Sequence, residues 1–227
     1  VTALDAAANY ECGIWIGAET TIRAVTEAIL SSVGATGTPD RSGQWTATQL
    51  LAPSGSPAFA FVDADIETID REAPLDASGG IPVWRVKIRY KRHWTPFSSA
   101  DLVAVGGAPP SLTEAQRADL LQEWRATAPA TDAATQTKHL LATSLDRDTL
   151  LISATDAASE RDRLLALHKL RRDYVRLSVP LASDVAALDV GQTISVTTPA
   201  RGDYGGRRMG IRGVTRAGNP IHVDLWG

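Results

Sequence analysis

Residues 81–94, IPVWRVKIRYKRHW, most constrain the fold because apolar and basic side chains alternate along them. One set of alternate positions is apolar or aromatic (Trp84, Val86, Ile88 and Tyr90), and the other is basic (Arg85, Lys87, Arg89 and Lys91). A two-residue period places successive side chains on opposite faces of an extended chain, which predicts a half-buried β-strand. We expect its apolar face to pack on a helix over residues 19–33.

Length and composition indicate an ordinary globular protein. The 227 residues allow one large or two small domains at roughly 100–200 residues each. Hydrophobic residues make up 44% and charged residues 22%, and the net charge of -3 argues against a dedicated nucleic-acid binder. Cys12 is the single cysteine and excludes an internal disulfide, and no apolar run approaches a membrane span of about 20 residues. The chain opens without Met or a secretory signal, so we expect a fragment or processed product.

The first half of the chain predicts one helix and several strands. Apolar spacing indicates the helix over 19–33, with Gly34 as its C-terminal cap. A hairpin is expected over 37–50 with its turn at 40–43. Beyond it we expect a strand from 59, a helical turn at 63–65, an acidic strand over 66–72 and a turn at 76–80. The acidic strand could pair its charges with the basic strand of 81–94.

The second half predicts two helices and a strand-rich end. Residues 95–110 look like a linker, Ser111 and Glu114 have capping-box spacing, and the helix they open runs to about Thr127. A strand over 135–143, a turn at 146–148 and a helix over 155–172 capped by Thr155 follow. The expected C-terminal elements are strands at 174–180, 192–198, 208–215 and 221–226, a helical turn at 185–188 and a glycine turn at 202–206.

These elements predict an α+β, strand-rich fold with antiparallel sheets and a few packed helices. The four C-terminal strands suggest a small β-barrel or sandwich-like module. We expect an α+β domain over 1–97, a crossing linker with a helix over 98–134, and a helix with the β module over 135–227.

The sequence gives no catalytic, cofactor-binding or metal-ligating residues. The four histidines, His93, His139, His168 and His222, have no metal-binding spacing. The carboxylate pairs Asp63/Asp65 and Asp146/Asp148 lie in turn-like contexts, and no Gly-x-Ser-x-Gly elbow is present. Glycines 202, 205 and 206 lack the Lys-Ser/Thr of a phosphate loop. We therefore predict no enzyme and no cofactor.

Two surface features have alternative interpretations. The basic strand face and the cationic helix end at Arg171 and Arg172 could face nucleic acid or an acidic partner, but a solvated or paired face is favoured. The tryptophans could form a sugar-binding platform, but core anchoring is favoured. They are Trp15, Trp45, Trp84, Trp94, Trp124 and Trp226.

Several motifs together resemble the hub region of tail-tip proteins from long-tailed phages and prophages. They are YKRHWT at 90–95 after the hairpin and alternating strand, VPL at 179–181, LDVGQTISVTTP at 188–199, GRRMGI at 206–211 and LWG at 225–227. In that family a strand and a short helix are followed by a glycine, a strand and a proline, then a glycine turn and two further strands. The family's fuller proteins carry additional hub and fibre domains, so the resemblance implies a fragment.

The resemblance implies a structural role in the virion tail tip after assembly in the bacterial host cytoplasm. Such hub proteins form a ring, usually a trimer, that joins the tail tube to the central spike or fibre. Implied partners are copies of the chain itself, other tail-tip and tail-tube proteins, and the tape-measure protein and DNA in passage. A ring requires a heterologous interface. The alternatives are a virion-associated glycan-binding or glycan-hydrolysing module and, more weakly, a nucleic-acid-binding module on the basic strand.

Overall fold

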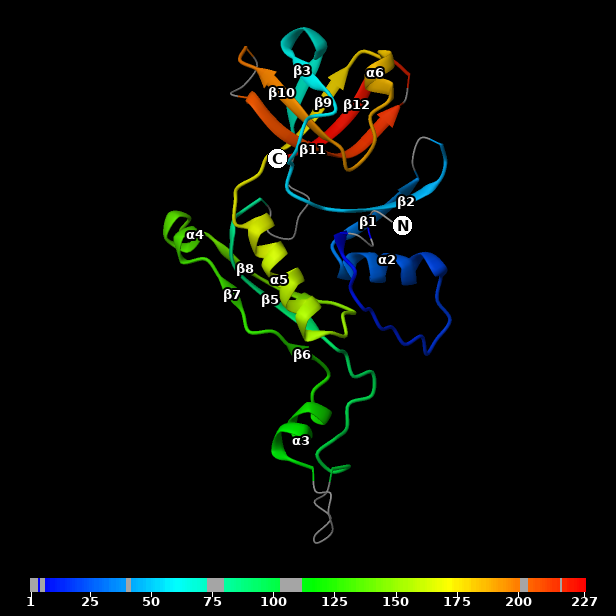
Figure 1. Cartoon of the computed structure of the whole chain (residues 1–227), viewed down its shortest axis with the longest axis vertical. Helices are drawn as coiled ribbons and strands as arrows, with labels where there is room; N and C mark the ends of the chain where they lie inside the picture. The colour runs from blue at the N-terminus through cyan, green and yellow to red at the C-terminus, as the bar shows by residue number, and fades with distance from the viewer. Residues whose placement is uncertain are drawn as a thin grey trace.

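The computed structural model describes residues 4, 7–39, 42–72, 80–102, 112–200, 204–216 and 218–227. Figure 1 shows three tiers along the long axis. A curled sheet occupies one end, a helix-covered sheet and a hairpin form the middle tier, and helix α3 lies at the other end. The α+β, strand-rich fold predicted from the sequence is confirmed.

The curled sheet contains six strands in the order β3-β10-β11-β12-β9-β4. Their bounds are β3 Ala60–Val62, β4 Thr68–Arg71, β9 Tyr174–Val179, β10 Thr193–Thr198, β11 Tyr204–Arg216 and β12 Ile221–Trp226. The four C-terminal strands pair antiparallel, as predicted, and β11 begins inside the stretch predicted as a glycine turn. The short strands β3 and β4 lie at the edges, with β3 parallel to β10.

Alternation builds the core of the curled sheet. Inward side chains of all six strands are buried or half-buried together, including Phe61, Leu177, Ile194, Met209, Ile211 and Val223. The helical turn predicted at 63–65 is present as η1 (Asp63–Asp65), and the short helix α6 (Ser183–Ala186) brings Val185 into the same core.

The acidic strand does not lie beside the basic one. β4 pairs with β9, in register Asp70 to Arg176. Arg176 donates to Asp224 Oδ1 at 2.7 Å and lies 3.1 Å from Glu72 Oε1. The acidic strand therefore pairs its charge with Arg176 of β9 and not with the basic strand of 81–94, which corrects the expectation.

The central sheet is built on the alternating strand, β5 (Val83–Tyr90). β8 (Thr143–Asp148) runs parallel to one edge, and the short strands β6 (Arg125–Ala126) and β7 (Ala130–Thr131) pair antiparallel with the other. Val86 and Ile88 are fully buried as predicted, whereas Trp84 and Tyr90 are half-buried.

The helix packed along β5 is α5 (Ala154–His168), which corrects the expectation of the 19–33 helix. Ala157 and Leu164 of α5 share a core with β5. The predicted first helix is α2 (Ile22–Ser32), and its C-terminal Leu30 joins the edge of that core. Three residues of β5, Val83, Val86 and Ile88, are buried in the core that these α5 side chains share.

Val33 and Gly34 connect α2 to a β-hairpin. β1 (Ala35–Pro39) and β2 (Trp45–Gln49) pair antiparallel as predicted, and the turn predicted at 40–43 lies partly outside the described residues. Gly34 has a φ of 63°, in the left-handed region where a side chain is strained. A Cβ there would also lie 2.0 Å from Arg163 Nη2, so both conformation and space require glycine.

Four predicted elements between 111 and 172 differ in the structure. Residues 133–138 form helix α4 (Ala133–Lys138) rather than a strand, because Asp132 caps Thr135 N at 2.9 Å. Residues 146–148 end strand β8 rather than form a turn. α3 (Glu114–Leu121) uses Thr113 and Gln116 as its capping box and ends before 127. Ser111 lies outside the described residues, and so does the turn predicted at 76–80 except for Gly80. α5 is capped by Ser153 rather than Thr155.

The sheets do not follow the division at 97 and 134. The curled sheet takes β3 and β4 from the first segment and β9–β12 from the third, while β5 pairs with β8 across the whole linker segment. The division into 1–97, 98–134 and 135–227 as separately folding units stays a prediction.

Truncating the core of β5 should destabilise the fold. We expect Ile88→Ala to lower the free energy of unfolding by about 2–5 kcal/mol, because it opens a cavity under a fully buried side chain. The same substitution at the exposed Ile22 is the matched control and should change it by no more than about 0.5 kcal/mol. Urea unfolding measures both; equal losses would contradict the placement of the core.

Candidate functional site

The four histidines are dispersed. His93 follows β5, His139 follows α4, His168 ends α5, and His222 lies in β12. Across the described residues no group of three His, Cys, Asp or Glu side chains could hold a metal ion. The interpretation of all four as structural or surface residues remains a prediction.

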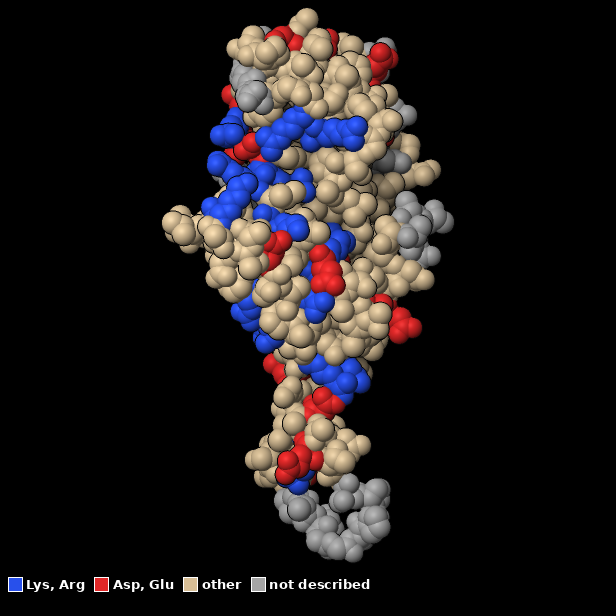
Figure 2. All heavy atoms as spheres, turned by 60° about the vertical axis from the view of Figure 1, so that its left-hand side comes forward, with Lys and Arg blue, Asp and Glu red and all other residues tan. Residues whose placement is uncertain are grey.

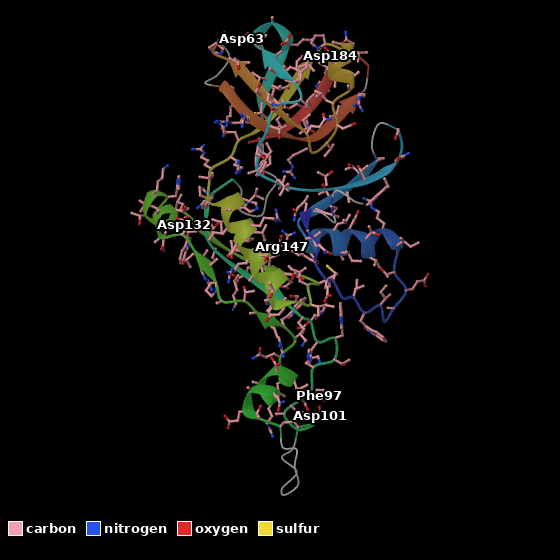
Figure 3. The ribbon with its side chains drawn as sticks, in the orientation of Figure 1. Asp63, Phe97, Asp101, Asp132, Arg147 and Asp184 are labelled. Carbon is pink, nitrogen blue, oxygen red and sulfur yellow. The ribbon has the colours of Figure 1, made fainter. Side chains whose placement is uncertain are left out.

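The carboxylates singled out in the sequence serve local structure. Asp65 accepts from Val62 N at 3.0 Å, and Asp148 pairs with Arg89 at 2.5 Å. Figure 3 shows Asp63, the other member of the first pair, at the curled-sheet end together with Asp184, whereas Asp132 lies beside α4 and Asp101 near α3. Asp101 accepts from Ser98 Oγ and N, and these hydrogen bonds lower the pKa of Asp101 below its ordinary value.

The largest described cleft lies between the hairpin and the curled sheet and has a volume of about 530 Å³. Threonines of β1 and β2, the chain at 50–54 and strands β10 and β11 line it, with Arg212 and Trp226. Its described lining residues include no Asp or Glu. Among its described lining residues there is therefore no pair of facing carboxylates of the kind that most glycoside hydrolases use.

The tryptophans are mostly not core anchors, which corrects the favoured interpretation. Trp226 is buried, with the Arg172 guanidinium 4.4 Å from its ring centroid. Trp84 and Trp124 are half-buried, and the remaining three are exposed: Trp15, Trp45 and Trp94. Arg92 lies between two of these rings, 4.4 Å from Trp94 and 5.2 Å from Trp124. The exposed rings lie on separate elements and form no shared platform.

The basic face of β5 is partly balanced by its parallel neighbour. Side chains of β8 alternate, so Leu145 and Arg147 are half-buried while Ser144, Asp146 and Asp148 are exposed. The register places Lys87 opposite Asp146 and Arg89 opposite Asp148. Arg89 and Asp148 form an ion pair. This outcome favours a paired, solvated strand face over a surface that binds polyanions.

Arginines also gather where the curled sheet meets the middle tier, and Figure 2 shows a band of Lys and Arg there, with acidic residues among them. Asp173, in the connection from α5 to β9, accepts from Arg71 at 2.9 Å and from Arg207 at 2.6 Å. Arg207 also donates to Gly227 O at 2.5 Å. Asp173 and Gly227 also exchange backbone hydrogen bonds next to the β9–β12 pairing, so this network ties strands of the curled sheet to one another at the end where α5 leads into it.

A buried ion pair fixes the middle tier, and sequence reasoning missed it. Glu160 on α5 has no exposed side-chain surface and accepts from Arg163 at 2.6 and 2.7 Å in a two-bond arrangement. Arg163 also donates to Leu50 O at 2.6 Å, at the end of the hairpin. The available signal was an i,i+3 acid–base pair on the helix face that also carries Ala157 and Leu164.

A second arginine enters the same region from β8. Arg147, labelled at the centre of Figure 3, donates to Ser31 O at 2.6 Å at the C-terminal end of α2. Burial lowers the pKa of Arg147 below its ordinary value, and the negative charge of Glu160 opposes that shift. Glu160 is thus the anion that the buried arginines share.

Helix α4 is attached to α5 by one carboxylate. Asp132 Oδ1 caps Thr135 N, and Asp132 Oδ2 accepts from Lys169 Nζ at 3.1 Å. The backbone hydrogen bond from Thr135 and the bond from Lys169 lower the pKa of Asp132 below its ordinary value. The position of α4 on the flank of the middle tier therefore depends on ionised Asp132.

Within the described ranges, no helix is both long enough and apolar enough to cross a membrane.

Comparison with known proteins finds solved structures with a similar fold. No protein-family model matches the sequence, and a sequence search finds no match among curated proteins. The tail protein from Neisseria meningitidis MC58 superposes with a TM-score of 0.56 at 14% identity, over 95% of this chain and 58% of that one. A chain in the virion of a native gene transfer agent particle superposes with a TM-score of 0.53 at 20% identity, over 90% of this chain and 38% of that one.

The fold is therefore one found in virion and tail proteins, and it extends over nearly the whole described chain. The chain spans 38% and 58% of the lengths of these two solved chains. Both the curled sheet and the middle tier must belong to the shared fold, because neither alone would cover 90% of the residues.

Removing the charge of Glu160 should destabilise the protein strongly. We expect Glu160→Gln to lower the free energy of unfolding by about 3–5 kcal/mol, since it leaves buried arginine charge without its partner. Glu27→Gln removes a carboxylate from the exposed pair with Arg23 and should cost at most about 0.5 kcal/mol. Chemical denaturation compares the two variants; similar losses would show that the pair at Glu160 does not organise the tier.

The contribution of Asp132 to the stability of the folded protein should depend on pH. Its folded pKa lies below the ordinary value of 3.8, so its stabilisation is complete above the unfolded pKa and is lost as pH falls through the folded pKa. Asp132→Asn keeps a capping side chain but removes the charge. Urea titrations should show wild type more stable at neutral pH, with the difference shrinking below pH 3.8. A difference that persists unchanged in stronger acid would contradict this role.

Proposed function

We propose that this protein is a structural component of a phage tail, located in the tail tip or baseplate hub. The observation that carries the proposal is the likeness of fold over 90% and 95% of the chain to a gene transfer agent virion chain and a Neisseria tail protein. In this role the chain joins the tail tube to the central spike or fibre by assembling into a ring, with a trimer as the proposed ring.

The contacts of the described chain suit a scaffold. The middle tier is fixed by the Glu160–Arg163 pair, and Asp173 ties two strands of the curled sheet together through Arg71 and Arg207. A ring subunit needs such rigidity because its two interfaces must keep a constant angle for the ring to close. In this proposal the chain has a structural and not a catalytic role.

The proposed partners follow from that location. They are further copies of this chain, other tail-tip and tail-tube proteins, and the tape-measure protein and DNA during their passage. Assembly takes place in the bacterial host cytoplasm before the virion is released. The arginine-rich junction and the charge-paired outer face of β5 supply polar surfaces for such protein contacts.

The alternative of a glycan-binding or glycan-hydrolysing virion module has less support. Trp15 and Trp45 are exposed, as a glycan platform requires, but they lie on different elements. Hydrolysis would further require a carboxylate pair across a cleft, and the described cleft lining supplies none.

Labelling of intact virions tests the proposed location. Antibodies against this chain, bound to gold, should label the tail end distal to the head in electron micrographs, and antibody pre-adsorbed with the chain should not label. Deletion of the gene should yield tails without a normal tip. Label along the tube or on the head, or normal tails in the deletion strain, would contradict the proposal.

A further inference from the structure

Two adjacent leucines protrude from the middle tier. Leu140 and Leu141, in the turn between α4 and β8, are 94% and 78% exposed. Asp132 and Lys169 hold the preceding helix against α5, so this turn projects from a fixed support. Adjacent leucines with this exposure on a supported turn form an apolar knob, which we name the Leu140–Leu141 knob.

A shallow apolar hollow occurs at the start of α2. Its volume is about 420 Å³, and Ile16, Ala18, Glu19, Thr20, Ile22, Val25 and Thr26 line it. Ile22 is 87% exposed and Ile16 is 52% exposed. We name this feature the Ile22 hollow. An apolar cavity of about 150 Å³ accommodates a benzene-sized group, so the Ile22 hollow has room for two leucine side chains.

The knob and the hollow lie on opposite flanks of the same tier. Figure 1 shows α4 at the left edge of the middle tier and α2, with the loop before it, at the right edge. A two-fold interface would bring a patch against its own copy. A convex patch on one flank and a concave patch on the other instead suit a head-to-tail contact, which repeats around a closed ring.

Charge at the two features is also complementary. Lys138 ends α4 just before the knob, and Glu19 lines the hollow. Both are exposed, and in the described part of the chain neither forms an ion pair. An incoming knob would bring Lys138 toward Glu19 of the next copy. One chain therefore carries both the knob with Lys138 and the hollow with Glu19, so a second copy of the chain is the favoured occupant of the hollow.

We propose that the Leu140–Leu141 knob of one copy inserts into the Ile22 hollow of the next, with Lys138 facing Glu19 across the contact. This inference deepens the proposed ring assembly and rests on it. The knob alone covers less than the roughly 800 Å² per partner of a standard interface, so isolated copies associate weakly. Covalent trapping is therefore the suitable measurement.

Disulfide trapping tests the contact directly. In a Cys12→Ser background, which removes the single native cysteine, Leu140→Cys and Ile22→Cys proteins are made separately, mixed and oxidised. The expected product is the mixed dimer, and a double variant should give higher oligomers. Leu181→Cys, 57% exposed on the curled-sheet tier, is the matched control and should give at most background with Ile22→Cys.

Charge exchange adds a second readout. Lys138→Glu should lower the mixed-dimer yield by about two- to fivefold at low salt, and adding Glu19→Lys in the partner protein should restore it. These side chains are exposed, so neither change is expected to unfold the chain.

The outcomes separate this contact from the proposed function. Homodimers through Ile22→Cys or Leu140→Cys that equal the mixed dimer, or a mixed yield no higher than the Leu181→Cys control, would overturn the contact. Tail-tip labelling of virions would still support the hub role in that case. Trapping in the expected pairs with virions that carry no label at the tip would support the contact and contradict the hub role.

Discussion

The buried pair of Glu160 and Arg163 is the interaction on which the middle tier depends. A buried carboxylate is tolerated when its charge and hydrogen-bonding capacity are matched, and Arg163 does this with two hydrogen bonds. The same guanidinium holds the carbonyl of Leu50, and the lack of a side chain at Gly34 leaves it space. Helix α5, the hairpin and the end of α2, which Arg147 contacts, are consequently fixed to one another by a single cluster.

A second polar cluster fixes strands of the curled sheet beside its junction with the middle tier. Asp173 receives Arg71 from an edge strand and Arg207 from the middle of the sheet, and Arg207 also holds the C-terminal carbonyl of Gly227. Arg172 packs over the buried Trp226 at the same junction. Charge-assisted hydrogen bonds therefore tie the strands of the curled sheet together, and Trp226 packs with Leu167 of α5 and with Tyr174 where that sheet meets the middle tier. A subunit that must hold constant angles within an assembly benefits from such a junction.

The shared fold supports the proposed role, but it does not explain two surface features of this chain. Solved virion and tail proteins match the chain over both the curled sheet and the middle tier, at sequence identities of 14% and 20%. At that divergence the core pattern persists while surface residues are free to change. The Leu140–Leu141 knob and the Ile22 hollow are surface features of this chain, exposed without a partner in a single copy. Contact with neighbouring copies would bury these exposed apolar side chains and would explain why the chain carries them.

The sequence by itself determined the elements whose period or cap is local. Alternation identified β5 and the C-terminal strands, and apolar spacing with Gly34 identified α2. It did not determine which elements meet: β4 pairs with β9, α5 covers β5, and β8 lies parallel to β5. Strand pairing joins residues far apart in sequence, so packing and hydrogen bonds decide it rather than local preference. The same applies to the candidate surfaces, since the exposure of Leu140 and the burial of Glu160 depend on what the tertiary structure places around them.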